Sequence, residues 1–245
     1  MKLTAEKLSI GYGEDKIIFP TISFAAGEGE MIALLGVNGI GKSTLLRTIS
    51  GLQKSVGGTI SVEGKPLETL SVQEKAKLIS IVLTERIFVD NISVKEFVAL
   101  GRSPYTGWLG NLSPEDVNEL EKVMDVMHLE KLQHKLFNQI SDGEKQKALI
   151  ARALCQQTPV IILDEPTAFL DFRNKKEILE LLASVSHDLK KTVILSTHDI
   201  EASLEHCSKC WVMTEDKKFV EISRSENFRK EVMSLLFAET LNSHS

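Results

Sequence analysis

The sequence predicts an α/β fold in which helices cover both faces of a parallel sheet. Two short, wholly apolar runs, residues 160–163 and 192–195, are typical of buried strands. Between them, the residues from about 174 to 189 predict a long helix. Apolar strands that alternate with helices indicate a parallel sheet, because the crossover helices bury both faces of its strands. A chain of 245 residues is long enough for one large unit with a substantial core.

The N-terminal third of the chain is rich in predicted strands. Residues 3–12 alternate apolar and polar side chains, as a strand with one buried face does. A glycine-rich turn at residues 27–30 and another at 63–64 separate further strands. The predicted elements are, in order, strands at 3–12, 17–24 and 31–35, a helix at 43–49, and strands at 59–62 and 79–83.

The middle of the chain changes character and is predicted to be mostly helical. A helix at 93–100 is broken by the segment 101–105. Ser113 and Pro114 then start another helix, with a hydroxyl at the N-cap, proline at the first helical position and acids in the first turn. From Lys209 onward, the chain predicts a hairpin followed by a helix.

The composition excludes several classes of protein. A net charge of −5 gives no support for broad electrostatic binding to nucleic acid, so we expect no nucleic-acid partner. No apolar stretch approaches the roughly 20 residues that span a bilayer, and no leader pattern is present. We therefore expect a cytoplasmic protein whose membrane role, if any, comes through a partner.

The three cysteines leave two interpretations. Cys207 and Cys210, next to His206, have the spacing of half a metal or redox site. A four-ligand zinc site needs a second pair, and the sequence contains none. The pattern therefore favours an ordinary reduced pair near a strand.

A phosphate-binding loop is the most specific pattern in the chain. Residues 36–44 fit G-x-x-x-x-G-K-[ST], and they lie between a predicted buried strand and a predicted helix, as this motif requires. The glycines allow backbone N–H groups to wrap an anion, and the helix N-terminus adds its positive dipole end. Lys42 is placed to reach the β- and γ-phosphates, and Ser43 to bind Mg²⁺.

Polar side chains follow two of the predicted parallel strands. Asp164 and Glu165 come directly after the run at 160–163, and His198 follows the run at 192–195. Ligands bind at the carboxyl ends of strands in open α/β sheets, so these side chains should meet there. We expect Asp164 to hold Mg²⁺, Glu165 to orient or deprotonate an attacking water, and His198 to donate to the γ-phosphate.

A capped helix begins at residues 140–144. Ser141 and Glu144 form the S-x-x-E pattern of a capping box, which satisfies the first backbone N–H groups of the helix. The pattern establishes the cap, and it leaves open whether the same helix end also binds phosphate.

Together these motifs resemble the nucleotide-binding subunit of an ABC transporter, over nearly the whole chain. Residues 36–44 match the Walker A loop, 140–144 the signature motif (usually LSGGQ), 160–165 Walker B, 168–171 the D-loop and 196–199 the switch histidine. The resemblance implies an ATPase with a head-to-tail dimer, in which each ATP lies between Walker A of one copy and the signature motif of the other. The implied nucleotide-binding residues are Tyr12, stacked on adenine, with Gly36, Asn38, Gly39, Gly41, Lys42, Ser43, Thr44, Ser141, Gly143 and Asp171.

The resemblance also implies a domain plan. It makes the chain a single ABC-type P-loop NTPase domain, residues 1–245, with a parallel core sheet and an N-terminal antiparallel β subdomain. Residues 1–84 and 158–245 would form the nucleotide-binding core, and 85–157 a helical subdomain that carries the signature motif.

Two segments of the helical part point to a subfamily. Residues 93–105 and 112–116 resemble importers of metal chelates, namely iron-siderophores, haem and cobalamin, and argue against exporters. The implied partners are membrane permease subunits, a second copy of this chain and, indirectly, a substrate-binding protein. The implied location is the inner face of the cell membrane, with ATP and Mg²⁺ as cofactors.

The sequence departs from the family pattern at three positions. Thr84, followed by Glu85 and Arg86, stands where the family has its Q-loop glutamine, and it is the third expected metal contact beside Ser43 and Asp164. Asp142 replaces a glycine of the signature motif and puts negative charge near the γ-phosphate. Glu144 replaces a glutamine, and either residue can serve in the cap.

Two alternatives stay open. One is an ABC ATPase of cofactor assembly or DNA repair without a membrane partner; DNA-repair members carry a long coiled coil in the insert, and this sequence has no heptad run there. The other is a nucleotide-dependent regulator that does not hydrolyse ATP, which Thr84 and Asp142 would favour.

Overall fold

The computed structural model describes residues 1–13, 16–84, 87, 89–107 and 110–237 of the chain. The strands in this part are β1 (Leu3–Gly11), β2 (Ile17–Ala26), β3 (Met31–Leu35), β4 (Gly57–Val62), β5 (Lys65–Pro66), β6 (Ile79–Val82), β7 (Val160–Asp164), β8 (Thr192–Ser196), β9 (Lys209–Met213) and β10 (Phe219–Ser223). The α-helices are α1 (Lys42–Ile49), α2 (Val72–Ala76), α3 (Val94–Ala99), α4 (Pro114–Val126), α5 (Asp142–Cys155), α6 (Phe172–Asp188), α7 (Ile200–His206) and α8 (Phe228–Phe237). Short 3₁₀ helices are η1 (Leu67–Thr69), η2 (Leu100–Arg102), η3 (Glu130–Leu132) and η4 (Phe137–Gln139). None of the helices described here is long and apolar enough to cross a membrane.

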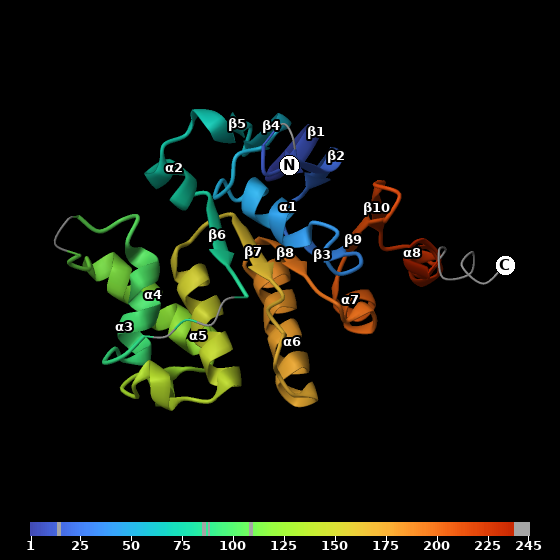
Figure 1. Ribbon diagram of the computed structural model, residues 1–245. Helices are drawn as coiled ribbons and strands as arrows, with labels where there is room; N and C mark the ends of the chain where they lie inside the picture. Colours follow the sequence, from blue (N-terminus) through green and yellow to red (C-terminus); the bar gives the residue numbers. More distant parts are fainter. Residues whose placement is uncertain (14–15, 85–86, 88, 108–109, 238–245) are drawn as a thin grey trace.

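The strands form two sheets (Figure 1). The smaller sheet is antiparallel, in the order β2-β1-β4-β5. The larger sheet has six strands in the order β10-β9-β3-β8-β7-β6, all parallel except β10, which pairs antiparallel with β9. The helices α3 and α4 lie on the β6 side of this sheet and pack against α5 (Figure 1). The predicted parallel core sheet and N-terminal antiparallel sheet are therefore confirmed.

The central parallel strands are buried on both faces, which explains their wholly apolar sequences. In β7, Ile161 and Leu163 belong to one hydrophobic cluster, and Val160 and Ile162 belong to a second. The split follows from strand geometry, because successive side chains point to opposite faces. The first cluster extends to the helices α3 to α6, and the second to the smaller sheet and α1.

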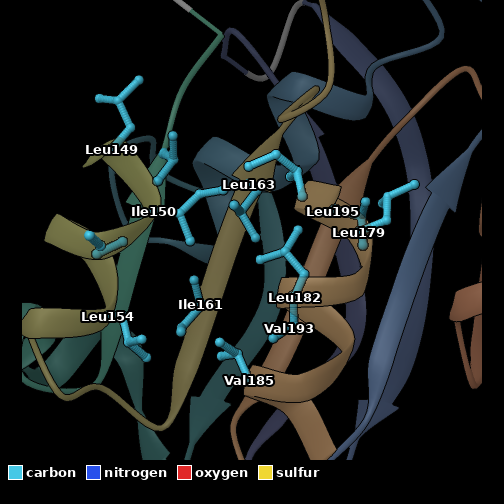
Figure 2. Close-up of a cluster of buried hydrophobic side chains, with 14 of the residues drawn as sticks. Leu149, Ile150, Leu154, Ile161, Leu163, Leu179, Leu182, Val185, Val193 and Leu195 are labelled. Atoms are coloured by element: carbon cyan, nitrogen blue, oxygen red, sulfur yellow. The ribbon is translucent and has the colours of Figure 1, made fainter. Parts of the chain in front are cut away.

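Two long helices pack side by side on the first of these faces (Figure 2). Ile150 of α5 and the side chains of Leu182 and Val185 of α6 lie over Ile161 and Val193 of the sheet. Each is almost wholly buried, and burying a side chain of this size contributes about 1.5–3 kcal/mol. This packing fixes the two helices against the strands whose ends carry the predicted polar residues.

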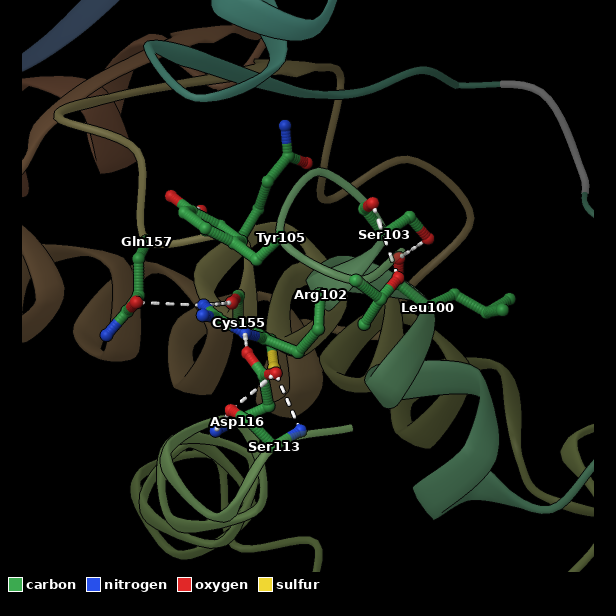
Figure 3. Close-up of polar contacts among 10 residues, drawn as sticks. Leu100, Arg102, Ser103, Tyr105, Ser113, Asp116, Cys155 and Gln157 are labelled. Carbon is green, nitrogen blue, oxygen red and sulfur yellow. Dashed lines mark hydrogen bonds and ion pairs between the residues drawn. The ribbon is translucent and has the colours of Figure 1, made fainter. Parts of the chain in front are cut away.

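A buried ion pair secures the helical part of the chain (Figure 3). Arg102 and Asp116 are each 5% exposed, and Arg102 Nε donates to Asp116 Oδ1 over 2.7 Å. Arg102 Nη1 donates to the Cys155 carbonyl oxygen and to Gln157 Oε1, both at 2.8 Å. The guanidinium carbon lies 4.1 Å from the centroid of the Tyr105 ring. Buried charges need such partners, and here they join η2, α4 and the C-terminal end of α5.

The cysteine pair lies in the core. Cys207 and Cys210 are fully buried, and burial raises the pKa of the Cys210 thiol to about 12 and raises that of Cys207 as well. Among the residues that the structure describes, no group of three His, Cys, Asp or Glu side chains is arranged to hold a metal ion. Both thiols are therefore protonated core side chains at neutral pH.

Candidate functional site

The loop between β3 and α1 has the backbone that an anion-binding loop requires. Gly36 has φ 150°, and a Cβ atom there would lie 2.6 Å from the Met213 carbonyl oxygen. Gly41 has φ 119° and lies directly before the first residue of α1. Both positions therefore need glycine, one for close packing against β9 and one for the left-handed turn into the helix.

The N-terminus of α1 is open to a ligand. In the described residues around it, α1 has no side-chain cap and no acidic residue in its first turn. The helices α2, α3, α4 and α5, by contrast, all begin with a complete capping box. Uncapped N–H groups and the positive dipole end make α1 the helix in this set that is best suited to bind phosphate.

Lys42 begins α1 and bends back over the loop. Its Nζ donates to the carbonyl oxygens of Gly36 at 2.7 Å and Val37 at 3.2 Å, and the residue is only 6% exposed. Burial lowers the pKa of Lys42, and the negative charges of Glu165 and Asp164 oppose that shift. The ammonium group is thus a partly desolvated cation held at the loop, with two carboxylates near enough to act on its charge.

The ends of β7 and β8 bring the predicted acidic residues and the histidine together. Asp164 is the last residue of β7 and is 5% exposed, and Glu165 follows it. His198 Nε2 lies 2.7 Å from Glu165 Oε1, a distance at which a ring N–H donates to the carboxylate. Both side chains are partly open to solvent, at 43% and 31% exposure for His198 and Glu165. The pair can therefore reach a ligand.

Thr84 follows β6 and lies beside the same strand end. Its Oγ1 donates to the main-chain carbonyl oxygen of Asp164 over 2.8 Å. The hydroxyl therefore braces the backbone of Asp164, while its oxygen keeps lone pairs for a further contact. Glu85 and Arg86, which complete this departure from the family pattern, lie outside the described residues.

The remaining predicted residues of the loop and β1 are placed around this centre. Asn38 and Gly39 are exposed at the tip of the loop, and Ser43 is exposed in the first turn of α1. Thr44 is buried. Tyr12 follows β1 and is 66% exposed, with Lys16 Nζ 5.5 Å from its ring centroid, so one ring face is available for stacking.

The signature residues lie at the start of α5 and form a complete cap. Ser141 Oγ and its backbone nitrogen both donate to Glu144 Oε2 at 2.8 Å. These bonds, with the backbone contact first, lower the pKa of Glu144 and keep it ionised. Among the described residues, Ser141 and Gly143 make no hydrogen bond or ion pair with residues 36–44. One chain therefore presents two separate half-sites.

The D-loop residue Asp171 caps α6. Its two carboxylate oxygens accept from the Asn174 backbone nitrogen at 2.9 Å and from Asn174 Nδ2 at 2.6 Å. The Asn174 backbone contact is the main cause of the lowered pKa of Asp171. A Cβ atom on Gly143 would lie 2.8 Å from Asn174 Oδ1, so the signature helix and the D-loop meet at one asparagine.

A hollow of about 180 Å³ separates the signature helix from the strand ends. Its lining includes Asp142 and Lys145 of α5 and, on the other side, Asp164, Glu165 and Phe169. Asp142 is exposed, and its Oδ1 lies 3.6 Å from Lys145 Nζ, which partly balances its charge. The hollow therefore lies between the start of α5 and the carboxylates of Asp164 and Glu165.

Ser196 is a site residue that the sequence interpretation missed. It ends β8 and is fully buried. Its Oγ donates to Asp164 Oδ1 at 2.6 Å and accepts from the Glu165 backbone nitrogen at 2.9 Å. A hydroxyl at the end of an apolar strand, two residues before His198, was the signal available in the sequence.

A glycine-rich loop on an open helix N-terminus, with Asp164, Glu165 and His198 at the adjacent strand ends, defines a P-loop nucleotide hydrolase. The comparison with protein families agrees and is more specific. Residues 19–168 match the family model described as ABC transporter. The chain therefore belongs to the ABC transporter family, as one of its ATP-binding ATPases.

Known relatives cover most of the chain. An ATP-binding protein of a siderophore transport system in Bacillus subtilis is 34% identical over 91% of this chain and 81% of its own length. A solved inward-facing transporter of the metal-chelate type has a TM-score of 0.81 at 27% identity, covering 97% of this chain and 89% of that chain. A dimeric ATP-binding cassette with bound ADP and phosphate has a TM-score of 0.77 at 26% identity, covering 91% of this chain and 99% of that chain.

Proposed function

We propose that this chain hydrolyses ATP to power the import of a metal chelate, such as an iron-siderophore, haem or cobalamin, through a separate membrane permease. The similarity to the siderophore transport protein supports the substrate class. The segments 93–105 and 112–116, which resemble such importers, are joined by the buried ion pair of Arg102 and Asp116. The observation that carries the hydrolytic part is the meeting of Glu165 and His198 beside Lys42.

The proposed reaction is in-line attack of water on the γ-phosphate. Lys42 would leave the Gly36 and Val37 carbonyl oxygens and bind the β- and γ-phosphates, whose charge exceeds that of a carbonyl dipole. Glu165 would accept a hydrogen bond from the attacking water, and His198 Nε2 would exchange its contact with Glu165 Oε1 for a hydrogen bond to the γ-phosphate. Catalysis is then positioning and charge stabilisation, with no covalent intermediate.

The donor set fits a divalent cation with a preference for oxygen. Asp164 presents a buried carboxylate with Oδ1 held by Ser196, which leaves Oδ2 for a metal, and the Ser43 hydroxyl is exposed at the start of α1. Thr84 would act through its hydroxyl oxygen or a bound water. When bound, Mg²⁺ would neutralise charge on the phosphate oxygens.

A second copy of this chain would complete the site. Within one chain, the start of α5 with Ser141 is separate from the loop that holds Lys42, and Ser141 on one side and Asn38 on the other are exposed. A head-to-tail pair would bring the start of α5 of one copy onto the nucleotide held by the other. The dimeric cassette with ADP and phosphate supports this arrangement.

The permease would hold the ATPase at the inner face of the membrane, and a substrate-binding protein would act only through the permease. Both parts follow from the proposed import function. Asp142 and Glu165 line the hollow between α5 and the strand ends. A partner that moved α5 would therefore change the distance between Asp142 and Glu165.

Uptake by a reconstituted complex tests the whole proposal. The chain is co-expressed with the permease subunits with which it copurifies and incorporated into vesicles, and ATP-dependent accumulation of a labelled iron-siderophore, labelled haem and labelled cobalamin is measured in separate assays. The wild-type complex should accumulate one of the three chelates, and the Lys42→Ala complex should accumulate none.

The matched control is Lys54→Ala, which removes an exposed lysine outside the site and should leave uptake unchanged. ATP hydrolysis without uptake of any of the three chelate classes would contradict the import proposal. Failure to copurify with the permease would favour an ATPase without a membrane partner.

A further inference from the structure

The last residue of β8 contacts the two acidic residues at the end of the neighbouring strand β7. Ser196 pairs with Asp164 across the parallel ladder of β7 and β8. Its hydroxyl donates to Asp164 Oδ1 at 2.6 Å and accepts from the Glu165 backbone nitrogen at 2.9 Å. One fully buried oxygen therefore connects two consecutive residues with different proposed tasks.

The two bonds act in opposite directions, and each fixes a different degree of freedom. A hydroxyl has one proton, and Ser196 donates it to Asp164 Oδ1. This bond fixes the rotation of the carboxylate and leaves Oδ2 without a contact from Ser196. Accepting from Glu165 satisfies a backbone N–H group at a residue with φ 50°, a conformation that non-glycine residues adopt only when their surroundings enforce it. The bond thus contributes to the direction in which the Glu165 side chain leaves the strand.

Contacts on either side make this position rigid. Thr84 Oγ1 binds the Asp164 carbonyl oxygen from β6, opposite the contact from β8. Two residues beyond Ser196, His198 binds the Glu165 carboxylate at 2.7 Å. Asp164 is therefore held at its carbonyl and its carboxylate, and Glu165 at its backbone and its side chain.

We propose that Ser196 is a positioning residue that couples the orientation of the metal ligand Asp164 to that of the general base Glu165. The proposal rests on the proposed ATPase function and adds to it a residue that contacts neither nucleotide nor water. Removing the hydroxyl leaves the Asp164 carboxylate free to rotate and the Glu165 N–H without its partner. Both the affinity for a divalent cation and the rate of hydrolysis should fall together.

The test separates metal binding from turnover. Mn²⁺ is titrated into the protein with a non-hydrolysable ATP analogue, and free Mn²⁺ is followed by electron paramagnetic resonance. Ser196→Ala should weaken Mn²⁺ binding by about 10- to 100-fold, the range found when an outer partner of a metal ligand is removed. Binding of the analogue without metal should match wild type, because Lys42 and the loop are untouched.

Two further variants keep the result interpretable. Ser196→Thr keeps the hydroxyl and should recover most of the Mn²⁺ affinity. Ser186→Ala removes another buried serine, one that bonds the Gly29 carbonyl oxygen at 2.8 Å away from the site, and should behave as wild type. Thermal unfolding of all variants shows whether the fold is kept.

Three outcomes decide the matter. Weaker Mn²⁺ binding in Ser196→Ala with recovery in Ser196→Thr supports the coupling, and kcat should fall with an unchanged KM for ATP at saturating metal. Wild-type Mn²⁺ affinity in a folded Ser196→Ala would overturn it. A wild-type protein that binds the analogue but never hydrolyses ATP would instead contradict the proposed function.

Discussion

At the scale of single residues, the hydrogen-bond partner of each polar side chain explains its position. Lys42 binds the loop carbonyls, Ser141 binds Glu144 and Asp171 binds Asn174. These contacts satisfy the polar atoms within one chain, and the proposed roles of Lys42 and Ser141 require exchanging some of them for phosphate oxygens. Tyr12 differs, because its ring is mostly exposed.

The exposed ring of Tyr12 should stack on the adenine base. We predict that Tyr12→Ala weakens ATP binding by about 1–3 kcal/mol, the usual loss when an aromatic platform for a base is removed. Tyr12→Phe keeps the ring and should bind as wild type does. Calorimetric titration with ATP measures both; equal affinities of wild type and Tyr12→Ala would reduce Tyr12 to an aromatic at a strand end.

The buried pair of Arg102 and Asp116 should carry stability that depends on pH. Asp116→Asn leaves the guanidinium without its counter-charge, and we predict a loss of about 3–5 kcal/mol in the free energy of unfolding at neutral pH. The backbone N–H at Ser113 is the largest cause that lowers the pKa of Asp116 below its ordinary value of 3.8, and Arg102 adds to it.

The lowered pKa of Asp116 determines how stability changes with pH. A folded pKa below the unfolded one gives stability that is complete above the unfolded pKa and lost as the pH falls through the folded pKa. Urea unfolding of wild type and Asp116→Asn should therefore differ by a constant amount near neutral pH and converge below about pH 4. A difference independent of pH would contradict this assignment.

At the scale of elements, local sequence patterns predicted individual helices and strands, whereas their arrangement in the sheets depends on pairing between distant residues. The strands β3, β7 and β8 and the helices α1 and α6 were predicted within two residues, since apolar runs and glycine turns are local signals. The division into a core and a helical subdomain at 85–157 stays a prediction. The helix α2 was missed because it has only five residues, although Ser71 and Glu74 give it a capping box.

The position of β9 was beyond local reasoning. Its hairpin with β10 was predicted, but its parallel pairing with β3 joins residues almost 180 positions apart, such as Leu34 and Trp211. The same limit applies to the candidate site. Strand ends predicted that Asp164, Glu165 and His198 would meet, while the hydroxyl contacts of Thr84 and Ser196 depend on register between strands.

The start of α5 should be tuned by Asp142. Its carboxylate interacts favourably with the positive N-terminal end of the α5 dipole and would repel the γ-phosphate of an ATP bound to a second copy. The charge therefore shifts the equilibrium between monomer and dimer toward the monomer. We predict that Asp142→Gly raises ATP-dependent dimerisation and slightly lowers the melting temperature. Sedimentation with ATP and Mg²⁺ at low and high salt measures the dimerisation. Added salt should reduce the difference in dimerisation between Asp142→Gly and wild type, because the Asp142 charge is exposed and screened.

Asp142→Asn is the matched variant, since it removes the charge without introducing glycine into the helix. It should dimerise like Asp142→Gly and melt closer to wild type. If neither variant dimerises better than wild type at low salt, Asp142 points away from the nucleotide and acts only on the helix and Lys145.

At the scale of the whole molecule, the chain is an ATP-binding cassette whose proposed nucleotide-binding residues lie on two separate segments. The loop at 36–44 lies on the core, and the signature residues lie at the start of α5. In the proposed reaction, hydrolysis would depend on the association of two copies. It would also depend on the position of α5, which the proposed membrane partner would hold.

Hydrolysis by Glu165 is the central claim, and Glu165→Gln tests it most directly. The substitution keeps the shape of the side chain and its proximity to His198, and it removes the charge that accepts a proton from water. ATP turnover is measured by phosphate release, and association by sedimentation with ATP and Mg²⁺. The account predicts that the variant loses turnover, retains ATP and accumulates as a dimer. Phosphate release at the wild-type rate by Glu165→Gln would contradict it.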